Sequence, residues 1–116
     1  NDTHGHAAGD IVLRAVAGSI KSQLRNVDMV FRFGGEEFLI LLSNTGRDAA
    51  GMVGERLRRA AQVQDYWADG KRIELTVSLG CSTLLAAESA ESLLRRADNA
   101  LYVAKREGRN RLAMAG

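Results

Sequence analysis

Apolar residues recur at helical spacing in three stretches of the chain. In the first stretch the residues on one face are Leu13, Val16, Ala17, Ile20 and Leu24. The polar, glycine-punctuated opening NDTHGHAAGD precedes them, so we expect a loop over residues 1–10 and a first helix after Asp10. A second helix is predicted over residues 47–64, and a third from about Leu93 to a left-handed cap near Gly108.

The segments between the helices have the composition of strands. Residues 29–33 and 38–42 are aromatic and aliphatic. Gly34 and Gly35 between them predict a β-hairpin, because glycine accepts the positive φ angles of tight turns. The stretch RIELTVSLGCS alternates like a strand, RNRLAM can form a short last strand, and QDYWADGK is the expected surface turn. The order α-β-β-α-β-α-β predicts an α+β fold in which helices cover a largely antiparallel sheet.

Composition narrows the class of protein. A chain of 116 residues that is 46% hydrophobic and 26% charged is one domain with a hydrophobic core. Its formal net charge of +2 is far from that of a nucleic-acid-binding tail, so no nucleic-acid partner is expected. The single cysteine, Cys81, excludes an internal disulfide and a cysteine-rich zinc site. No apolar run approaches the roughly 20 residues that span a bilayer, so neither a membrane segment nor a signal peptide is expected. The expected location is cytoplasmic with no membrane contact by this segment, and an upstream segment that anchors the parent protein in a membrane stays open.

Two glutamates, Glu36 and Glu37, follow the glycines at the expected hairpin tip. One interpretation is that charged residues at an exposed tip keep the protein soluble. The other is that the glycine pair lets an anionic ligand approach the backbone while a carboxylate holds Mg²⁺ against the phosphates of that ligand. Magnesium usually takes one or two protein carboxylates, so a partner acid from a neighbouring strand is expected. The residues downstream of the hairpin offer no obvious one.

The motif GGEEF, residues 34–38, resembles the signature of the GGDEF family of diguanylate cyclases in its glutamate variant. Four other blocks resemble the family in order and spacing. They are NDTHGHAAGD, RNVD, TVSLG and NALYVAKREGRN. Together the five blocks extend over almost the whole chain, so residues 1–116 are identified as a GGDEF domain.

The resemblance implies a fold, a reaction and partners. The fold is that of palm-like nucleotide cyclases, and the reaction condenses two GTP molecules into cyclic di-GMP and pyrophosphate. Each domain of an antiparallel homodimer presents one GTP to the other. Mg²⁺ or Mn²⁺ is the implied cofactor, because metal ions polarise the phosphate and orient the nucleophile in such transfers. The implied setting is bacterial signalling.

Site roles follow from the positions that match the family's motifs. Glu36 matches the metal-binding catalytic acid, and Glu37 is a second catalytic candidate. The positions that match GTP-binding residues are Asn1, Asp10, Gly34, Gly35, Lys105 and Arg109. Arg25 and Asp28 match the product inhibitory site, where cyclic di-GMP binds away from catalysis. An exposed loop ion pair is the structural alternative for these two residues.

Other residues also have a structural alternative. With Asn1, Asp10 matches the residues that read the guanine edge, yet Asp10 also has the chemistry of an N-cap for the first helix. Lys105 and Arg109 match the contacts to the triphosphate, and they are equally suited to complement the negative C-terminal end of the last helix. Arg32 either pairs with a carboxylate or steadies the hairpin.

In the family, the position of Asn1 follows a strand that carries a DxD-type acid and an FK pair. The resemblance therefore implies an N-terminally incomplete domain, whose first strand and second metal-binding Asp are missing from these residues. On that basis residues 1–116 alone are expected to be inactive, and to pair with another chain or rearrange to close the gap. Two other functions stay open: a catalytically silent receptor for GTP or cyclic di-GMP, and a dimerisation module.

Overall fold

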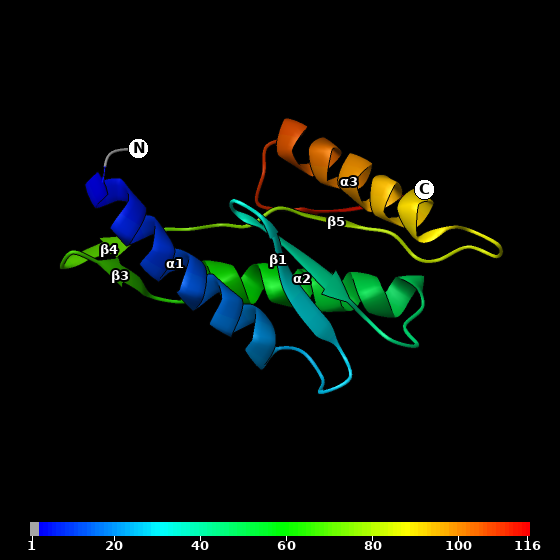
Figure 1. The fold of residues 1–116 in the computed structure, drawn as a ribbon, viewed down its shortest axis with the longest axis horizontal. Helices are drawn as coiled ribbons and strands as arrows, with labels where there is room; N and C mark the ends of the chain where they lie inside the picture. Colours follow the sequence, from blue (N-terminus) through cyan, green and yellow to red (C-terminus); the bar gives the residue numbers. More distant parts are fainter. Residues whose placement is uncertain (1–2) are drawn as a thin grey trace.

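Residues 3–116 form three helices and six short strands in the computed structural model, which describes side chains from residue 9 onward. The helices are α1 (Thr3–Ser22), α2 (Arg47–Val63) and α3 (Ala90–Arg106). The strands are β1 (Met29–Gly34), β2 (Glu37–Leu41), β3 (Tyr66–Ala68), β4 (Lys71–Ile73), β5 (Leu79–Cys81) and β6 (Leu112–Met114). Figure 1 shows α3 lying along β5, with α1 and α2 crossing below them. None of the helices in this part of the chain is long and apolar enough to cross a bilayer.

The strands pair as three separate sheets of two strands each within residues 3–116. β1–β2 and β3–β4 are antiparallel hairpins, whereas β5 and β6 run parallel. β5 and β6 can run parallel because helix α3 connects them, and its length returns the chain to the end at which β5 began before β6 starts. The predicted α+β class is confirmed. The strands are distributed over three pairs because no strand in the described part of the chain joins the hairpins to β5 and β6.

Helix α1 begins at Thr3, so the prediction of a loop over residues 1–10 and of a helix start after Asp10 is wrong. The stretch from Thr3 to Asp10 has two glycines and no proline, and a glycine inside a helix costs only about 1 kcal/mol. That cost is small beside the packing of the amphipathic helix that continues to Ser22. Asp10 therefore lies inside α1, and its interpretation as the N-cap is also wrong.

The chain between α2 and β5 contains a second hairpin. Asp69 and Gly70 have positive φ angles of 54° and 73° and join β3 to β4. Asp-Gly is a preferred pair for a two-residue hairpin turn, so QDYWADGK carried a hairpin signal and not only a surface turn. The stretch RIELTVSLGCS correspondingly divides between β4 and β5, with residues 74–78 outside any strand.

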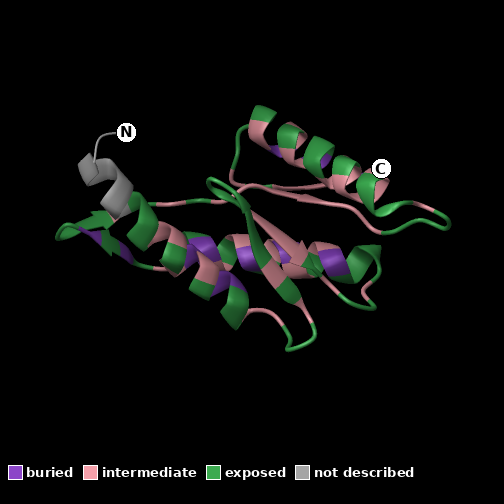
Figure 2. Ribbon diagram, viewed as in Figure 1, coloured by how far each residue is buried: buried purple, intermediate pink, exposed green. Residues whose placement is uncertain are grey.

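The core lies where α1, α2 and β3 meet. Its buried centre comprises Val16, Ile20, Leu57 and Tyr66. One face of the β1–β2 hairpin packs against it through Val30, Phe38 and Ile40. The Tyr66 hydroxyl donates to the Ala61 carbonyl oxygen at 2.7 Å, so the polar end of this buried ring is satisfied. Figure 2 places buried residues along α1, α2 and β3 and shows the hairpin tip as exposed.

Helix α3 packs directly on the backbone of β5. A Cβ atom at Gly80 would clash with the Ala97 carbonyl oxygen and the Leu101 amide nitrogen, so only glycine allows this approach. Ala104, one residue before Lys105, is fully buried on the same helix. The close packing fixes the C-terminal end of α3 and with it the origin of the Lys105 side chain.

Candidate functional site

The tip of the β1–β2 hairpin presents the GGEEF motif. Gly34 pairs with Glu37 at the end of the ladder, which leaves Gly35 and Glu36 as the turn. The predicted hairpin is confirmed, but neither glycine uses the positive φ angle that was expected of it. The register is irregular at Phe33, and such a bulge adds local twist that a glycine turn would otherwise supply.

The backbone of the two motif glycines is accessible. A Cβ atom added at Gly34 or Gly35 would meet no heavy atom within 4 Å. Arg32 donates from Nε and Nη2 to the Gly35 carbonyl oxygen at 3.0 and 2.7 Å. Of the two roles expected for Arg32, the structure therefore gives the one that steadies the hairpin. The turn is held by its own strand while its glycine backbone stays open to a ligand.

The last helix brings positive charge to the hairpin. Lys105 Nζ lies 3.8 Å from Glu37 Oε2. In Figure 1 the tip of the β1–β2 hairpin correspondingly lies near the chain that follows α3. Both side chains are partly exposed, so this ion pair adds little stability. Arg109 follows the end of α3 in a left-handed conformation, with φ 63°, and its side chain is exposed. The structure thus brings Glu37 and Lys105 together, and with them the motif and the end of α3.

Glu36 is exposed at the tip, and no hydrogen bond or ion pair to another described residue engages its carboxylate. Carboxylate oxygens are the ligands that Mg²⁺ prefers, and the ion usually keeps several positions for water and substrate phosphates. The described residues contain no cluster of three or more acidic, histidine or cysteine side chains. The exposed Glu36 carboxylate, which has no partner among the described residues, fits the role of one protein ligand to such an ion.

The residues that match the guanine contacts are less well connected to the tip. Asn1 lies outside the described residues. Asp10 is exposed on α1, and no hydrogen bond or ion pair joins it to another described residue. Helix α1 itself contacts α2 and β3. The described contacts therefore link Lys105 to the motif, but they do not link Asp10 to it.

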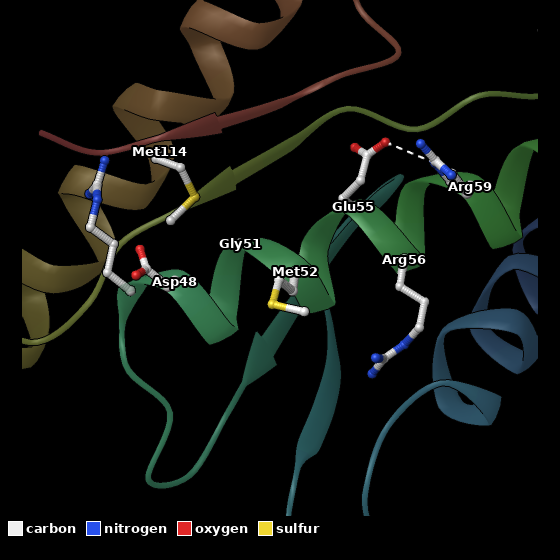
Figure 3. A pocket seen from close by; sticks show the side chains of 8 residues that line it. Asp48, Gly51, Met52, Glu55, Arg56, Arg59 and Met114 are labelled. Carbon is white, nitrogen blue, oxygen red and sulfur yellow. Dashed lines mark hydrogen bonds and ion pairs between the residues drawn. The ribbon is translucent and has the colours of Figure 1, made fainter.

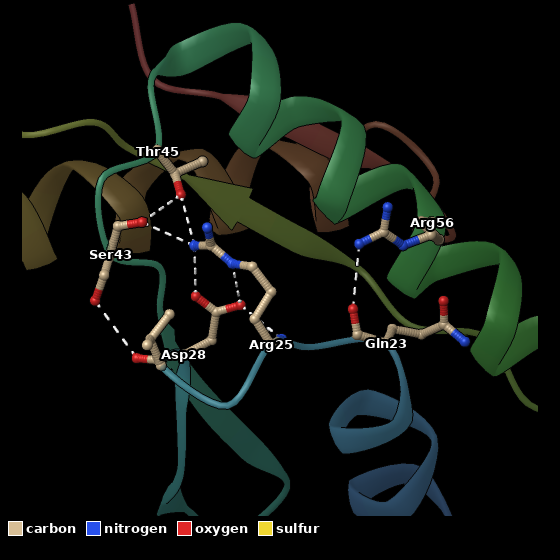
Figure 4. A network of polar contacts seen from close by, with 7 residues as sticks. Gln23, Arg25, Asp28, Ser43, Thr45 and Arg56 are labelled. Atoms are coloured by element: carbon tan, nitrogen blue, oxygen red, sulfur yellow. Dashed lines mark hydrogen bonds and ion pairs between the residues drawn. The ribbon is translucent and has the colours of Figure 1, made fainter.

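Arg25 and Asp28 form a closed corner between α1 and β1 (Figure 4). Arg25 donates from Nε to Asp28 Oδ2 at 3.1 Å and from Nη2 to Asp28 Oδ1 at 2.8 Å, the geometry of a strong paired interaction. Nη2 also reaches the Ser43 carbonyl oxygen and the Thr45 hydroxyl, at 2.8 and 3.1 Å. The Arg25 hydrogen bond lowers the pKa of Asp28 to about 2, so this carboxylate stays charged at neutral pH.

The two members of this corner differ in access. The Asp28 side chain is 3% exposed, whereas the Arg25 side chain is 56% exposed. A surface hollow of about 450 Å³ lies beside them. Its other lining residues include Lys21, Leu24, Asn26 and Phe31. Arg25 is therefore the group that a ligand can reach, and Asp28 is the group that orients it.

A larger hollow of about 620 Å³ lies on α2 beside β6 (Figure 3). The residues that line it include Arg47, Met52, Arg56, Arg59 and Met114. None of the residues expected to bind GTP or metal lines it. Arg59 pairs with Glu55 at 3.1 Å, and Arg56 donates to the Gln23 carbonyl oxygen at 3.1 Å. Size alone therefore does not locate the candidate site, because the charges suited to a metal–triphosphate meet at the hairpin tip.

Comparisons with known proteins decide the family. The family profile described as "Diguanylate cyclase, GGDEF domain" matches residues 1–111. This chain belongs to the GGDEF family. A relative, diguanylate cyclase A of Treponema denticola, is 50% identical over 116 residues, which cover 99% of this chain and 31% of that protein. The chain therefore spans about a third of the length of this relative.

Solved GGDEF structures have the same fold. Diguanylate cyclase SiaD of Pseudomonas aeruginosa, in complex with its activator SiaC, matches with a TM-score of 0.92 and 39% identity, over 99% of this chain and 44% of that one. The GGDEF domain of DgcB from Caulobacter crescentus, in complex with c-di-GMP, matches with a TM-score of 0.91 and 34% identity, over 99% and 69%. These matches agree with the assignment of the chain to the GGDEF family.

Reasoning from the sequence missed the residues that close the Arg25 corner. Ser43 and Thr45 lie in the turn between β2 and α2, where the Thr45 hydroxyl also donates to the Ser43 carbonyl oxygen at 2.8 Å. Serine and threonine in turns commonly bond to nearby backbone, so SNTG carried a signal for the local contact. Nothing in the local pattern indicated that Arg25 would reach this turn.

Proposed function

We propose that this GGDEF domain is a diguanylate cyclase domain that condenses two GTP molecules into cyclic di-GMP and pyrophosphate. The observation that carries the proposal is the approach of Lys105 Nζ to Glu37 Oε2 at 3.8 Å, which sets a cation of α3 beside the carboxylates of the motif. A triphosphate with its metal ion needs both kinds of charge in one place. The names of the relatives, and the DgcB structure with c-di-GMP, support the same reaction.

Lys105 and Arg109 are the proposed contacts to the triphosphate. The alternative, that both only complement the C-terminal end of α3, suits Lys105 in the last turn. Arg109 lies just beyond the helix end with an exposed side chain, so its guanidinium is also open to a ligand. The open backbone at Gly34 and Gly35 leaves room for phosphate oxygens at the tip.

Glu36 is the proposed protein ligand for Mg²⁺ or Mn²⁺. When bound, the ion polarises the α-phosphate and neutralises the charge that develops during attack. The exposed Glu36 carboxylate, which has no partner among the described residues, suits this role. Glu37 is the second catalytic candidate, and its ion pair with Lys105 places it at the same edge of the hairpin.

The proposed reaction has two equivalent transfer steps. In each step the 3′-hydroxyl oxygen of one GTP forms a bond to the α-phosphorus of the other. The bond from that phosphorus to the oxygen of the leaving pyrophosphate breaks, and the hydroxyl proton passes to a base or to water. Two such steps close the ring and release two pyrophosphates. Because each domain presents one GTP, the proposed active unit is a homodimer of GGDEF domains.

Asn1 and Asp10 are the proposed guanine contacts. An amide and a carboxylate together accept and donate as the guanine edge requires. The exposure of Asp10 leaves its carboxylate free to accept from the base. An Asp10→Asn substitution that raised the KM for GTP, and that weakened inhibition by GDP more than inhibition by inorganic triphosphate, would support this assignment.

Arg25 is the proposed contact to cyclic di-GMP at a separate inhibitory site. Its side chain is 56% exposed beside a hollow of about 450 Å³, and a guanidinium suits phosphate or a guanine edge. Asp28 is proposed to fix the orientation of that guanidinium rather than to reach the ligand itself, because its own side chain is 3% exposed.

Incubation of the full-length protein with GTP and Mg²⁺, followed by chromatography of the nucleotides, tests the proposed function. The expected result is cyclic di-GMP formation that the Glu36→Gln substitution abolishes. Calorimetric binding of cyclic di-GMP without any turnover would instead indicate a silent receptor. Neither binding nor turnover, in a protein that still dimerises, would indicate a dimerisation module.

A further inference from the structure

We propose that Arg58 is a positioning residue for GTP binding, which holds the loop after α3 in the conformation from which Arg109 contacts the triphosphate. The inference rests on the proposed cyclase function, in which Arg109 has that role. Arg58 lies on α2, outside all the motifs that resemble the family. It acts through the loop and does not touch the substrate.

The loop after α3 has an unusual backbone. Three successive residues have positive φ: Gly108 at 124°, Arg109 at 63° and Asn110 at 47°. Glycine adopts such angles freely and asparagine tolerates them, but the left-handed region is disfavoured for arginine. A conformation of this kind persists only where the surrounding contacts determine it.

Contacts from several elements hold this loop. The Arg109 amide donates to the Ala104 carbonyl oxygen at 3.0 Å, and the Asn110 amide donates to Ser78 Oγ at 3.2 Å. Arg58 Nη1 donates to Asn110 Oδ1 at 2.8 Å. The first contact ties the loop to α3 and the second ties it to the residue before β5. The Arg58 contact ties the loop to α2, and it fixes the residue that directly follows Arg109.

Arg58 is itself held in place. Its Nε and Nη2 donate to the two carboxylate oxygens of Glu55 at 2.9 and 2.6 Å, and Nη1 reaches Gln62 Oε1 at 3.1 Å. The Arg58 side chain is 16% exposed, whereas that of Arg59, which also pairs with Glu55, is 73% exposed. These contacts restrict the position of the Arg58 guanidinium, so its hydrogen bond to Asn110 also restricts the loop.

Lys105 and Arg109 depend differently on this contact. Lys105 is in the last turn of α3, and the packing of that helix on Gly80 fixes its position. Arg109 lies beyond the helix, and its position is set by the left-handed loop and by the contacts that hold that loop. Loss of the Arg58 contact should therefore release Arg109 and leave Lys105 in place. GTP binding should weaken while the chemistry at Glu36 continues.

Steady-state kinetics of the full-length protein test this inference, with Arg58→Met compared with Arg59→Met. Arg59 provides a matched control, because it pairs with the same Glu55 but does not donate a hydrogen bond to Asn110. For Arg58→Met we expect the KM for GTP to rise about tenfold and kcat to stay within about twofold, the pattern of lost uniform binding. Arg59→Met should leave both within about twofold. Equal KM values for the two variants would overturn the inference.

A double-mutant cycle separates positioning from a general loss of structure. In an Arg109→Ala background, Arg58→Met should cause no further rise in KM, because its effect passes through Arg109. Additive effects of the two substitutions would overturn the inference.

Substitution of Asn110 gives a second test, which also decides the matter if Arg58→Met fails to fold. Asn110→Gly keeps the positive φ accessible and removes the acceptor, so it should raise the KM as Arg58→Met does. Asn110→Asp keeps an acceptor for Arg58 and should retain the wild-type KM. Equal KM values for these two variants contradict the inference. A wild-type protein without cyclase activity would instead overturn the proposed function. If the protein is a cyclase that depends on Glu36, but substitutions of Arg58 and Asn110 leave its KM for GTP unchanged, only this inference is overturned.

Discussion

The hairpin tip and the Arg25 corner both carry residues that resemble motifs of the GGDEF family, but their charges are used in opposite ways. At the tip, Glu36 has no partner among the described residues, and Glu37 makes only a long ion pair of 3.8 Å with Lys105. In the corner, Arg25 binds both oxygens of Asp28 and also reaches the turn before α2. One region leaves its charges available, and the other satisfies them within the protein.

This difference indicates how each region should respond to substitution. A charge that is already paired contributes to stability, and its loss leaves the partner without a hydrogen bond. A charge that is exposed and unpaired contributes little to stability and remains free for a ligand. Substitutions at the tip should therefore change activity without changing stability. Substitutions in the corner should change stability together with product binding.

Glu36→Gln should give the largest effect on activity. An amide keeps the shape of the side chain but loses the charge that would hold Mg²⁺, so cyclic di-GMP formation should fall by more than about a hundredfold, at 1.36 kcal/mol per decade. The melting temperature should stay unchanged, because no described residue pairs with the Glu36 carboxylate. Nucleotide chromatography and a thermal melt of the full-length protein measure the two quantities.

Glu74→Gln is the matched control for this substitution. Glu74 is an exposed glutamate outside the motif, so its change to glutamine should affect neither turnover nor the melt. Activity of Glu36→Gln within about tenfold of wild type would remove Glu36 from the metal site.

Arg25→Ala should have a smaller effect, and on product binding rather than catalysis. The exposed edge of the Arg25 guanidinium is the proposed contact, so affinity for cyclic di-GMP should fall about tenfold. Initial turnover, before product accumulates, should stay the same. The melting temperature should fall, because Asp28 would lose the paired hydrogen bonds that it accepts from the Arg25 guanidinium.

Calorimetry with cyclic di-GMP measures the affinity, with Arg14→Ala as a control that removes an exposed arginine from α1. Unchanged affinity together with a lower melting temperature would assign Arg25 and Asp28 to structure alone.

Stability should fall in acid because three carboxylates have a depressed pKa. They are Asp28, Glu55 and Glu88, each with a pKa of about 2 because of a hydrogen bond from an arginine side chain. In the unfolded chain their ordinary values are 3.8 and 4.5, so the folded protein binds these protons more weakly. Their stabilising contribution is present above pH 4.5 and is lost as the pH falls towards 2.

Urea unfolding at a series of pH values measures this dependence. The midpoint should fall between pH 4.5 and pH 2, and Asp28→Asn should make that fall shallower because one of the three groups no longer titrates. A midpoint that is constant over this range would contradict the proposed contribution of the paired carboxylates.

Much of the fold could be predicted from periodicity. The second and third helices, the β1–β2 hairpin and the last strand follow from apolar spacing and turn residues. The start of α1 could not be predicted, because the glycines near Asp10 are typical of a loop. The packing of the whole helix outweighs the free-energy cost of placing these glycines in it. The division of the strands into three pairs could not either, since pairing depends on which strands meet in space.

The candidate site shows the same limit. The GGEEF motif identified Glu36 and Glu37 as candidate site residues. The prediction that Lys105 belongs to the same site came only from the resemblance to the family. The partners of Arg25 in the β2–α2 turn lie 18 and 20 positions away in the chain, and Asn110 lies 52 positions from Arg58. Side-chain contacts across such distances have no local sequence signal, so they require the structure.

Glu37→Gln should have only a small effect on stability, and it tests how the tip and α3 are held together. The ion pair with Lys105 is 3.8 Å long and both side chains are exposed by more than a third, so its loss should change the free energy of unfolding by less than about 0.5 kcal/mol. Lys105 should stay in place, because α3 is positioned by its packing on β5 at Gly80 and not by this pair.

Gly80→Ala supplies the contrast for this last prediction. The added methyl group would clash with the Ala97 carbonyl oxygen and the Leu101 amide nitrogen, so the variant should lose about 1–3 kcal/mol of stability as an overpacked core does. Chemical denaturation of wild type, Glu37→Gln and Gly80→Ala measures all three stabilities. If Glu37→Gln were destabilised as much as Gly80→Ala, the hairpin and α3 would be joined by their charges. The tip would then be a structural junction as closed as the Arg25 corner.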